Sequence, residues 1–300
     1  MTDTKTPQLS VVVPSVNGWS DLEGCLAALV ANRDRELEIL VPDRVGDDLR
    51  HRCAERFPEV VILPLPAGTT IPMMRAAAFD RATAPAVAVI EDHVLVPPDW
   101  AARMLAALAE SDGAVGGAVE NAATETLVDR AAYLCEYSAL TPPIPAGEVD
   151  WIAGNNTIYR RDLLAARRDL YHSGGWENRL HDALKAAGLR LVCRPEIVVG
   201  HAMHYSFLDY FSQRYLYARS YAGARLEGAG LGKRLVYGAA AFLLPAILFL
   251  RITSAIWKKG RDRGTLIVSL PLLFCFVCAW GFGEVMGYWF GAGDALAKVR

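Results

Sequence analysis

The chain has 300 residues, of which 53% are hydrophobic and 21% are charged. That composition excludes a disordered chain, a collagen-like repeat and a basic protein that coats nucleic acid. The charge is uneven: residues 201–300 hold 12 Lys and Arg against 5 Asp and Glu, whereas residues 1–200 hold 19 against 28. An acidic region followed by a basic, apolar third indicates a membrane-lipid partner rather than nucleic acid.

The N-terminal stretch MTDTKTPQ is polar and leads directly into the apolar run 9–13. It lacks the basic start, apolar stretch and cleavage site of a secretory signal, so we expect none. The six cysteines are dispersed without zinc-site spacing, and Cys275-x-x-Cys278 lies inside an apolar run where a redox role is unexpected. These features predict that the globular part lies in a reducing cytoplasm.

Residues 8–200 alternate between short apolar runs and stretches with helical spacing. Strands are predicted at 9–14, 37–41, 60–63 and 86–90. Ser20-x-x-Glu23 has the pattern of a capping box at the start of the first helix. Strands separated by helices predict an α/β fold with a mostly parallel sheet covered on both faces. Ligands bind beyond the carboxyl ends of such strands.

Polar clusters follow three of these predicted strands. The first strand runs into Pro14-Ser15-Val16-Asn17, the second into Pro42-Asp43 and the fourth into Glu91-Asp92-His93. The chain has neither Gly-x-Gly-x-x-Gly after its first strand nor a P-loop motif, which lowers the odds of dinucleotide binding and of P-loop chemistry. The clusters point instead to a site for a charged small molecule.

Six segments, in this order, resemble the family 2 glycosyltransferases, whose GT-A fold is an α/β domain that binds nucleotide sugars. They are VVVPSVNGWSDLEGCLAAL, EILVPDRVGDD, MMRAAAFDRA, VIEDHVLVPPDW, GNNTIYRRDLL and WENRLHDALKAAGLRLVCRPEIVVGH. The resemblance covers about residues 9–220 and implies a GT-A domain over residues 1–204. It also implies a nucleotide-sugar donor.

The resemblance implies a divalent cation, Mn²⁺ or Mg²⁺, at an Asp-x-Asp turn. Here Glu91 and His93 occupy the two Asp positions, and residues two apart at a strand end project to one side. A histidine ligand favours Mn²⁺ over Mg²⁺, because Mg²⁺ prefers oxygen ligands. His201, after the run 196–200, is the third metal candidate, with a core histidine as the alternative; His204 is undecided. A metal-independent enzyme and a solvated acidic loop remain open.

The catalytic base is the second departure from the family pattern. The family's Glu-Asp pair precedes a glycine by twelve and eleven residues, and counting back from Gly188 places Trp176 and Glu177 there. A glutamate can remove a proton from an acceptor hydroxyl, so Glu177 is the predicted base. Asp182 is the second choice, because it lies about 140° around a helix from Glu177. The alternative for Glu177 is a structural role, because the helix dipole favours an acidic residue in the first turn of a helix.

The remaining candidates are expected at the donor. The resemblance implies that Asp43 binds the nucleoside base, that Arg75 faces the nucleotide or the acidic turns, and that Gly154 and Asn155 lie by the donor sugar. The predicted cofactor-binding set is Pro14, Val16, Asn17, Asp43, Arg75, Asp92, Gly154 and Asn155.

The C-terminal third is expected at the membrane. Residues 205–233 predict an amphipathic interfacial helix and linker, which lies on lipid or binds the acceptor's diphosphate. Residues 234–300 predict a membrane-associated segment with apolar runs 235–257 and 265–290. Both the connector 258–263 and the approach to the first run are basic, so the first run is predicted to be interfacial or re-entrant and the second to span. A buried hairpin in a soluble core is the alternative.

Together these features predict an inverting glycosyltransferase anchored to the plasma (inner) membrane, with its catalytic domain facing the cytoplasm. The expected acceptor is a hydroxyl on a lipid-linked molecule or a growing glycan. Two alternatives remain: sugar transfer to a polyprenyl phosphate, and a catalytically silent partner that keeps the fold within a membrane assembly.

Overall fold

The computed structural model describes residues 6–32 and 35–300, so part of the N-terminal stretch MTDTKTPQ lies outside the described residues. The chain divides into two compact units. The first contains the residues up to 120 together with 142–202, and the second contains 121–141 and 203–300. Residues 121–141, which fall within the domain predicted over 1–204, therefore group with the C-terminal helices.

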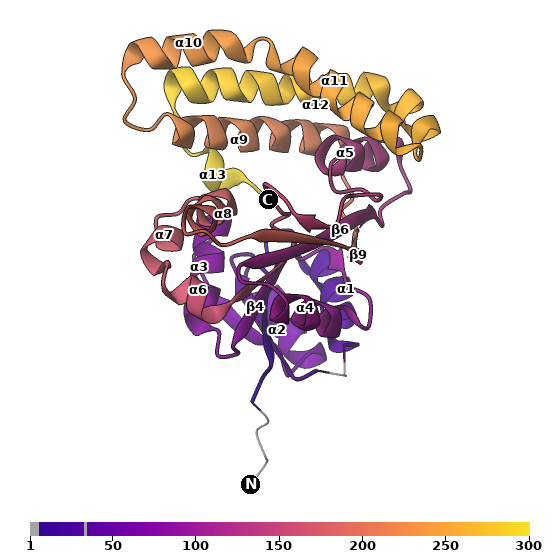
Figure 1. Ribbon diagram of the computed structural model, residues 1–300, viewed down its shortest axis with the longest axis vertical. Coiled ribbons are helices and arrows are strands. Elements are labelled where there is room, and N and C mark those ends of the chain that lie inside the picture. Colours follow the sequence, from indigo (N-terminus) through magenta and orange to yellow (C-terminus); the bar gives the residue numbers. More distant parts are fainter. Residues whose placement is uncertain (1–5, 33–34) are drawn as a thin grey trace. The chain divides into compact units, whose positions relative to one another are not determined.

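Four parallel strands form one half of the sheet in the first unit (Figure 1). They are β1 (Leu9–Val12), β2 (Leu37–Asp43), β3 (Val61–Pro64) and β4 (Ala86–Ile90), in the order β3-β2-β1-β4. The connecting helices are α1 (Trp19–Val30), α2 (Asp47–Arg56) and α3 (Ile71–Arg81). Every residue of β1 and β4 is buried, so both faces of these strands are covered, as expected for parallel strands.

The other half of the sheet is antiparallel. It contains β5 (Val94–Leu95), β6 (Ala114–Asn121), β7 (Gly147–Glu148), β8 (Asn156–Arg160) and β9 (Leu191–His201). Strand β8 runs antiparallel to β4 and pairs Asn156 with Ile90, while β9 pairs His201 with Val94 of β5. The start of β8 and the end of β9 therefore lie at the carboxyl end of β4, where the metal turn is predicted. The helices between these strands are α4 (Trp100–Ala109), α6 (Arg161–Ala165), α7 (Arg168–His172) and α8 (Glu177–Ala186).

The capping box predicted at Ser20 and Glu23 is wrong. Helix α1 begins at Trp19, its N-cap is Gly18 with φ 126°, and no side chain caps it. The positive φ of Gly18 lets the chain turn sharply from the loop into the helix, so Ser20 already lies in the first turn. The structure instead has a capping box at α5 (Leu127–Tyr137), formed by Thr126 and Asp129.

The second unit is helical. Besides α5 it contains α9 (Phe207–Arg225), α10 (Leu231–Ala241), α11 (Leu244–Lys259), α12 (Arg263–Phe290) and α13 (Ala295–Lys298). Among the described residues, α12 is the one helix long and apolar enough to cross a membrane by itself. Helices α10 and α11 are together long and apolar enough to cross a membrane, but they are bent by 49° at the short break between them. Pro245 lies in the first turn of α11, where a proline is tolerated because the amide it lacks has no helical partner.

Candidate active site

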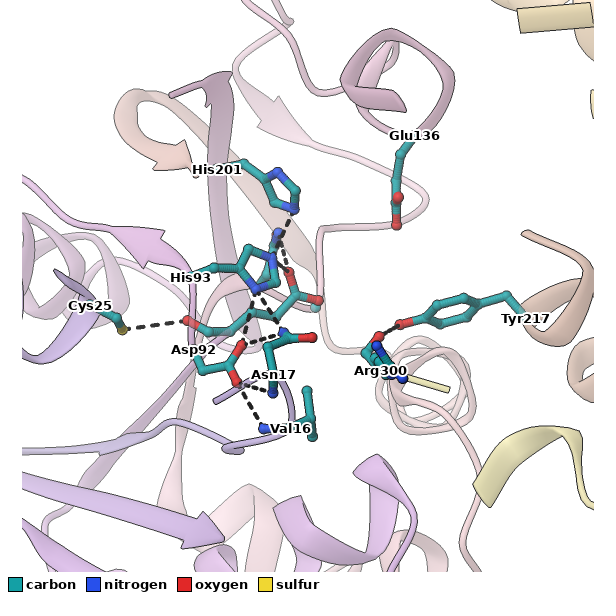
Figure 2. Close-up of polar contacts among 12 residues, drawn as sticks. Val16, Asn17, Cys25, Asp92, His93, Glu136, His201, Tyr217 and Arg300 are labelled. Atoms are coloured by element: carbon teal, nitrogen blue, oxygen red, sulfur yellow. Dashed lines mark hydrogen bonds and ion pairs between the residues drawn. The ribbon is translucent and has the colours of Figure 1, made fainter. Parts of the chain in front are cut away.

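Asp92 holds the loop that follows β1 against the turn that follows β4 (Figure 2). Its carboxylate accepts hydrogen bonds from the amides of Val16 and Asn17, at 2.8 and 2.9 Å, and from the Asn17 side chain at 2.8 Å. A fourth contact, at 3.0 Å, joins it to Nδ1 of His93. Asp92 is 0% exposed and its roughly four acceptor positions are used within the chain. Within the described residues Asp92 therefore positions this loop and His93, and its predicted contact with a cofactor stays a prediction.

The three predicted metal ligands lie together. Nε2 of His93 is 2.9 Å from Nε2 of His201 and 3.4 Å from a carboxylate oxygen of Glu91. One ligand atom from each residue lies within 4.8 Å of the others. Figure 2 shows the two imidazole rings turned toward each other. The antiparallel pairing of β9 with β5 explains how His201, more than a hundred residues along the chain, reaches His93.

Charge is strongly coupled within this group. Burial favours the neutral form of His93, but its bonds to Asp92 and Glu91 outweigh burial and raise its pKa to about 10. Burial and the neighbouring charge of His93 lower the pKa of His201 to about 3. Burial alone would raise the pKa of Glu91, but the bond to His93 and the surrounding positive charge lower it to about 2. These pKa shifts favour the charged form of His93, the neutral form of His201 and the ionised form of Glu91.

The donor set fits a divalent cation. Two nitrogen atoms 2.9 Å apart either share a proton or point their lone pairs at one ion. The contact between Asp92 and Nδ1 of His93 leaves Nε2 of that ring directed at the Glu91 carboxylate and His201. A carboxylate behind a ligating histidine is the common outer-shell arrangement of protein metal sites. Imidazole and carboxylate together suit Mn²⁺ better than Mg²⁺.

Glu177, the predicted base, opens helix α8 and is paired with Arg75 of α3. Nη1 of Arg75 donates to Oε2 of Glu177 at 2.7 Å, and Nη2 donates to the Gly154 carbonyl at 3.3 Å. A Cβ at Gly154 would come within 2.5 Å of Oε1 of Glu177, so a glycine is needed for this close approach. A pocket opens beside this pair, and its lining includes Arg75, Gly154, Tyr159, Trp176 and Glu177.

Asn155 connects the two groups. Its side-chain amide donates to Oε2 of Glu91 at 3.0 Å, and it follows Gly154 directly in the chain. The predicted base, Arg75, the 154–155 segment and the metal group thus form one continuous network in the first unit. The sequence predicted these residues singly and left their mutual contacts open.

Three other candidates lie apart from that network. Asp43 is 0% exposed and accepts from the amides of Val45 and Gly46 and, at 2.6 Å, from Arg50 Nε, which leaves little acceptor capacity for a nucleoside base. Asp182 has a 71% exposed side chain and pairs with Lys185 at 3.1 Å. Pro14 is buried at the end of β1, next to a β-bridge between Ser15 and Asp43.

Some supporting residues were missed from the sequence. Cys25 donates from Sγ to the Glu91 carbonyl at 3.5 Å, beneath the metal turn. The Tyr159 hydroxyl lies 2.7 Å from Nε2 of His181, one turn along α8 from Glu177. Arg50 holds Asp43. A cysteine in an amphipathic helix and an arginine in a charged one carry no sequence signal of such contacts, because both are ordinary at those positions.

Comparison with known proteins gives both a family and a fold. The profile of the family described as Glycosyl transferase family 2 matches residues 10–171. No curated protein matches the chain. Among solved structures, S. aureus TarS 1-349 is similar over 93% of this chain and 90% of its own, with 15% identity and a TM-score of 0.52. The same protein in complex with UDP gives 14% identity over the same shares and the same TM-score.

The mannosyltransferase PcManGT from Pyrobaculum calidifontis, solved in complex with GDP-Man and Mn²⁺, is similar over 98% of this chain and 86% of its own. It is 19% identical, and the TM-score is 0.50. At these identities the likeness shows the fold, and it agrees with the α/β sheet described above. The profile match covers more than half of the chain. The chain therefore belongs to glycosyl transferase family 2 and is a glycosyltransferase with the GT-A fold.

Proposed function

We propose that this glycosyltransferase is inverting and moves a sugar from a nucleotide-sugar donor to a hydroxyl of a lipid-linked or growing-glycan acceptor, at the cytoplasmic face of the inner membrane. One observation carries the proposal: Glu177 lies at the edge of a pocket, beside the Gly154-Asn155 segment that also contacts the Glu91–His93–His201 group. A carboxylate and a candidate diphosphate-binding site are thereby joined through two consecutive residues.

The chemistry follows from that arrangement. The Glu177 carboxylate accepts the proton of the acceptor hydroxyl, whose oxygen attacks the anomeric carbon from the face opposite the leaving nucleoside diphosphate. Arg75 positions Glu177 through the 2.7 Å ion pair and adds positive charge near the departing group. Glu91, His93 and His201 would hold Mn²⁺ or Mg²⁺, which when bound offsets the negative charge of the diphosphate.

Replacing the base tests the reaction. Glu177→Gln keeps the size of the side chain but removes its basicity, so turnover with a hydroxyl acceptor should fall on the order of 10²- to 10⁴-fold. Asp182→Asn serves as the comparison, since its exposed carboxylate lies on the same helix, and a change of less than about threefold is expected. Turnover is measured in detergent with a panel of nucleotide sugars.

Two other outcomes would change the proposal. Nearly full turnover of Glu177→Gln would favour transfer to a polyprenyl phosphate, an acceptor that is already an anion and needs no base. Calorimetry with UDP and GDP, each with and without Mn²⁺, checks that both variants still bind nucleotide. Absence of binding by the unaltered chain under every condition would favour a catalytically silent partner.

A further inference from the structure

The C-terminal helices carry a second inference, which rests on the membrane attachment proposed above but not on the donor or the acceptor. Helices α10 and α11 run antiparallel to α12 and form a hairpin with it. Arg234 near the start of α10 donates to the Tyr288 carbonyl at 2.9 Å, and at the opposite end Arg263 donates to the Trp257 carbonyl at 3.1 Å. Gly281 and Pro245 meet between these ends.

The hairpin exposes an almost continuous apolar surface. Large apolar side chains on both arms are more than half exposed: Phe242, Ile247 and Leu250 on one arm, and Ile267, Phe274 and Phe282 on the other. No charged residue occurs between 235 and 250 or between 265 and 283. An apolar surface of this extent is typical of contact with lipid. Whether the hairpin crosses the bilayer or lies within one leaflet depends on where its polar groups are.

Helix α9 begins beside the middle of α12. The rings of Phe207 and Tyr210 lie 5.7 and 4.6 Å from that of Phe276, the fourteenth of the 28 residues of α12. Further along, Arg225 of α9 pairs with Glu284 at 3.3 Å. Figure 1 shows α9 and α10 on opposite sides of α12 within this unit, and α12 contacts both.

That alignment places polar groups at the midpoint of α12. The α9 cap, Ser206, precedes Phe207 directly, and Asp129 accepts from the Tyr205 amide at 2.8 Å while contacting His204 at 3.2 Å. If α12 spanned the membrane, these groups would lie near the bilayer centre, about 15 Å from water on either side. Ser206 is only the fourth residue after Ala202, where the first unit ends, and a fully extended chain covers at most about 14 Å over that interval. If α12 crossed the bilayer, the polar groups of Asp129, His204 and Ser206 would therefore lie in the hydrocarbon layer.

Charges along the hairpin agree with this reasoning. Basic residues lie at both ends: Lys258, Lys259, Arg261 and Arg263 at the connector, and Arg219, Arg225, Lys233 and Arg234 at the other. Arg251 is exposed about halfway along α11. On a spanning hairpin one basic end would lie outside and Arg251 would face the hydrocarbon, both of which are unfavourable. On a hairpin within the membrane plane, the exposed side chains of Lys233, Arg251 and Lys258 reach lipid headgroups by extending along the surface.

We propose that the hairpin of α10, α11 and α12 lies in the plane of one leaflet, with both ends at the anionic headgroups and no segment crossing the bilayer. This proposal departs from the span that the sequence predicts over 265–290. The occupant of the apolar surface is phospholipid, and the binding chemistry is acyl chain along the hairpin and phosphate at its ends.

Cysteine labelling of the full chain in sealed membrane vesicles tests this proposal. Gly232→Cys and Gly264→Cys lie at opposite ends of the hairpin, and a Cβ at either glycine meets no atom within 4 Å. Gly68→Cys, equally open in the first unit, reports the side on which the catalytic domain lies. The background is Cys275→Ala with Cys278→Ala, because these are the two native cysteines that are not fully buried.

In vesicles whose outer face carries the catalytic domain, a membrane-impermeant maleimide should label Gly68→Cys and both hairpin positions. In vesicles of the opposite orientation it should label none of the three. Labelling of the two ends from opposite faces would overturn the proposal, as would labelling of either end only after detergent is added. A second pair at the exposed residues Lys258→Cys and Glu227→Cys repeats the test if either glycine variant fails to fold. Donor turnover of each variant is measured in parallel, so that a loss of transfer is distinguished from a change in topology.

Discussion

At the residue scale, the site depends on buried groups that touch no ligand themselves. Asp92 connects three parts of the site: the amides of Val16 and Asn17, the Asn17 side chain, and the ring of His93. Residues 91–94 form a hydrogen-bonded turn, in which the Val94 amide donates to the Glu91 carbonyl at 3.1 Å and the side chains of Glu91 and His93 meet. The sequence predicted that these two side chains project to one side, but for a different reason, the two-residue period of an extended chain. It did not predict the role of Asp92, because the residues that receive a carboxylate are known only when distant segments meet.

Asp92→Asn tests this positioning role. The amide cannot accept four hydrogen bonds, so the orientation of His93 is lost and Mn²⁺ affinity should fall about 10- to 100-fold. Leaving buried amides without partners should also cost about 1–3 kcal/mol of unfolding free energy. Affinity is measured by titration calorimetry, with the exposed Asp99→Asn as the matched control. Unchanged Mn²⁺ affinity in the Asp92 variant would contradict the positioning role of Asp92.

At the element scale, antiparallel strands complete a site that begins in the parallel half of the sheet. The predicted strands 9–14, 37–41, 60–63 and 86–90 correspond to β1, β2, β3 and β4, because buried parallel strands are short apolar runs. Strand β8 then brings Asn155 to Glu91, and β9 brings His201 to His93. Such pairing across the sheet has no local sequence signal. The capping box at Ser20 was predicted wrongly for a different reason: the N-cap is Gly18, whose positive φ starts the helix at Trp19.

Asp129 joins two elements of the second unit, α5 and α9, and its contribution should depend on pH. Burial alone would raise its pKa, but hydrogen bonds from Tyr205, Thr126 and His204 lower it below 3.8. A carboxyl with a lowered folded-state pKa adds stability above its unfolded value and loses it as the pH falls through the folded value.

Asp129→Asn should therefore lower the unfolding free energy of the full chain in detergent by about 1–3 kcal/mol at pH 7. The difference should shrink as the pH is lowered below 3.8. Thermal unfolding followed by circular dichroism measures it. Glu125→Gln is the control, since that exposed carboxylate approaches the same His204 at 3.5 Å without being buried. An equal loss in both variants, or a loss that does not vary with pH, would contradict the assignment.

At the scale of the whole molecule, the chain combines a family 2 glycosyltransferase fold with a helical unit whose surface is apolar. The surplus of basic residues after residue 200 accompanies that surface at both ends of the hairpin. In the proposed in-plane arrangement, the apolar surface and the basic ends both attract the chain to the membrane, but only the apolar attraction is insensitive to salt.

The full chain should consequently stay with membranes through a high-salt wash and be released by detergent. Each exposed Phe, Ile or Leu side chain that enters the lipid contributes about 1.5–3 kcal/mol to membrane binding. The sum over several of them exceeds the electrostatic attraction of the basic ends, which is the part that salt weakens. Fractionation of washed membranes followed by donor turnover measures it. Release by salt alone would show that the hairpin is not inserted among the acyl chains.

The sequence by itself determined the α/β class, the family and the residue types of the site, because periodicity and strand-end polarity are local properties of a chain. It also placed the apolar runs at the C-terminus. The tertiary structure decided which of those residues meet: Glu177 with Arg75, Asn155 with Glu91, and His201 with His93. It also aligned α9 with the middle of α12, on which the in-plane hairpin depends. Contacts between residues far apart in the chain arise from packing and pairing, and no local pattern encodes them.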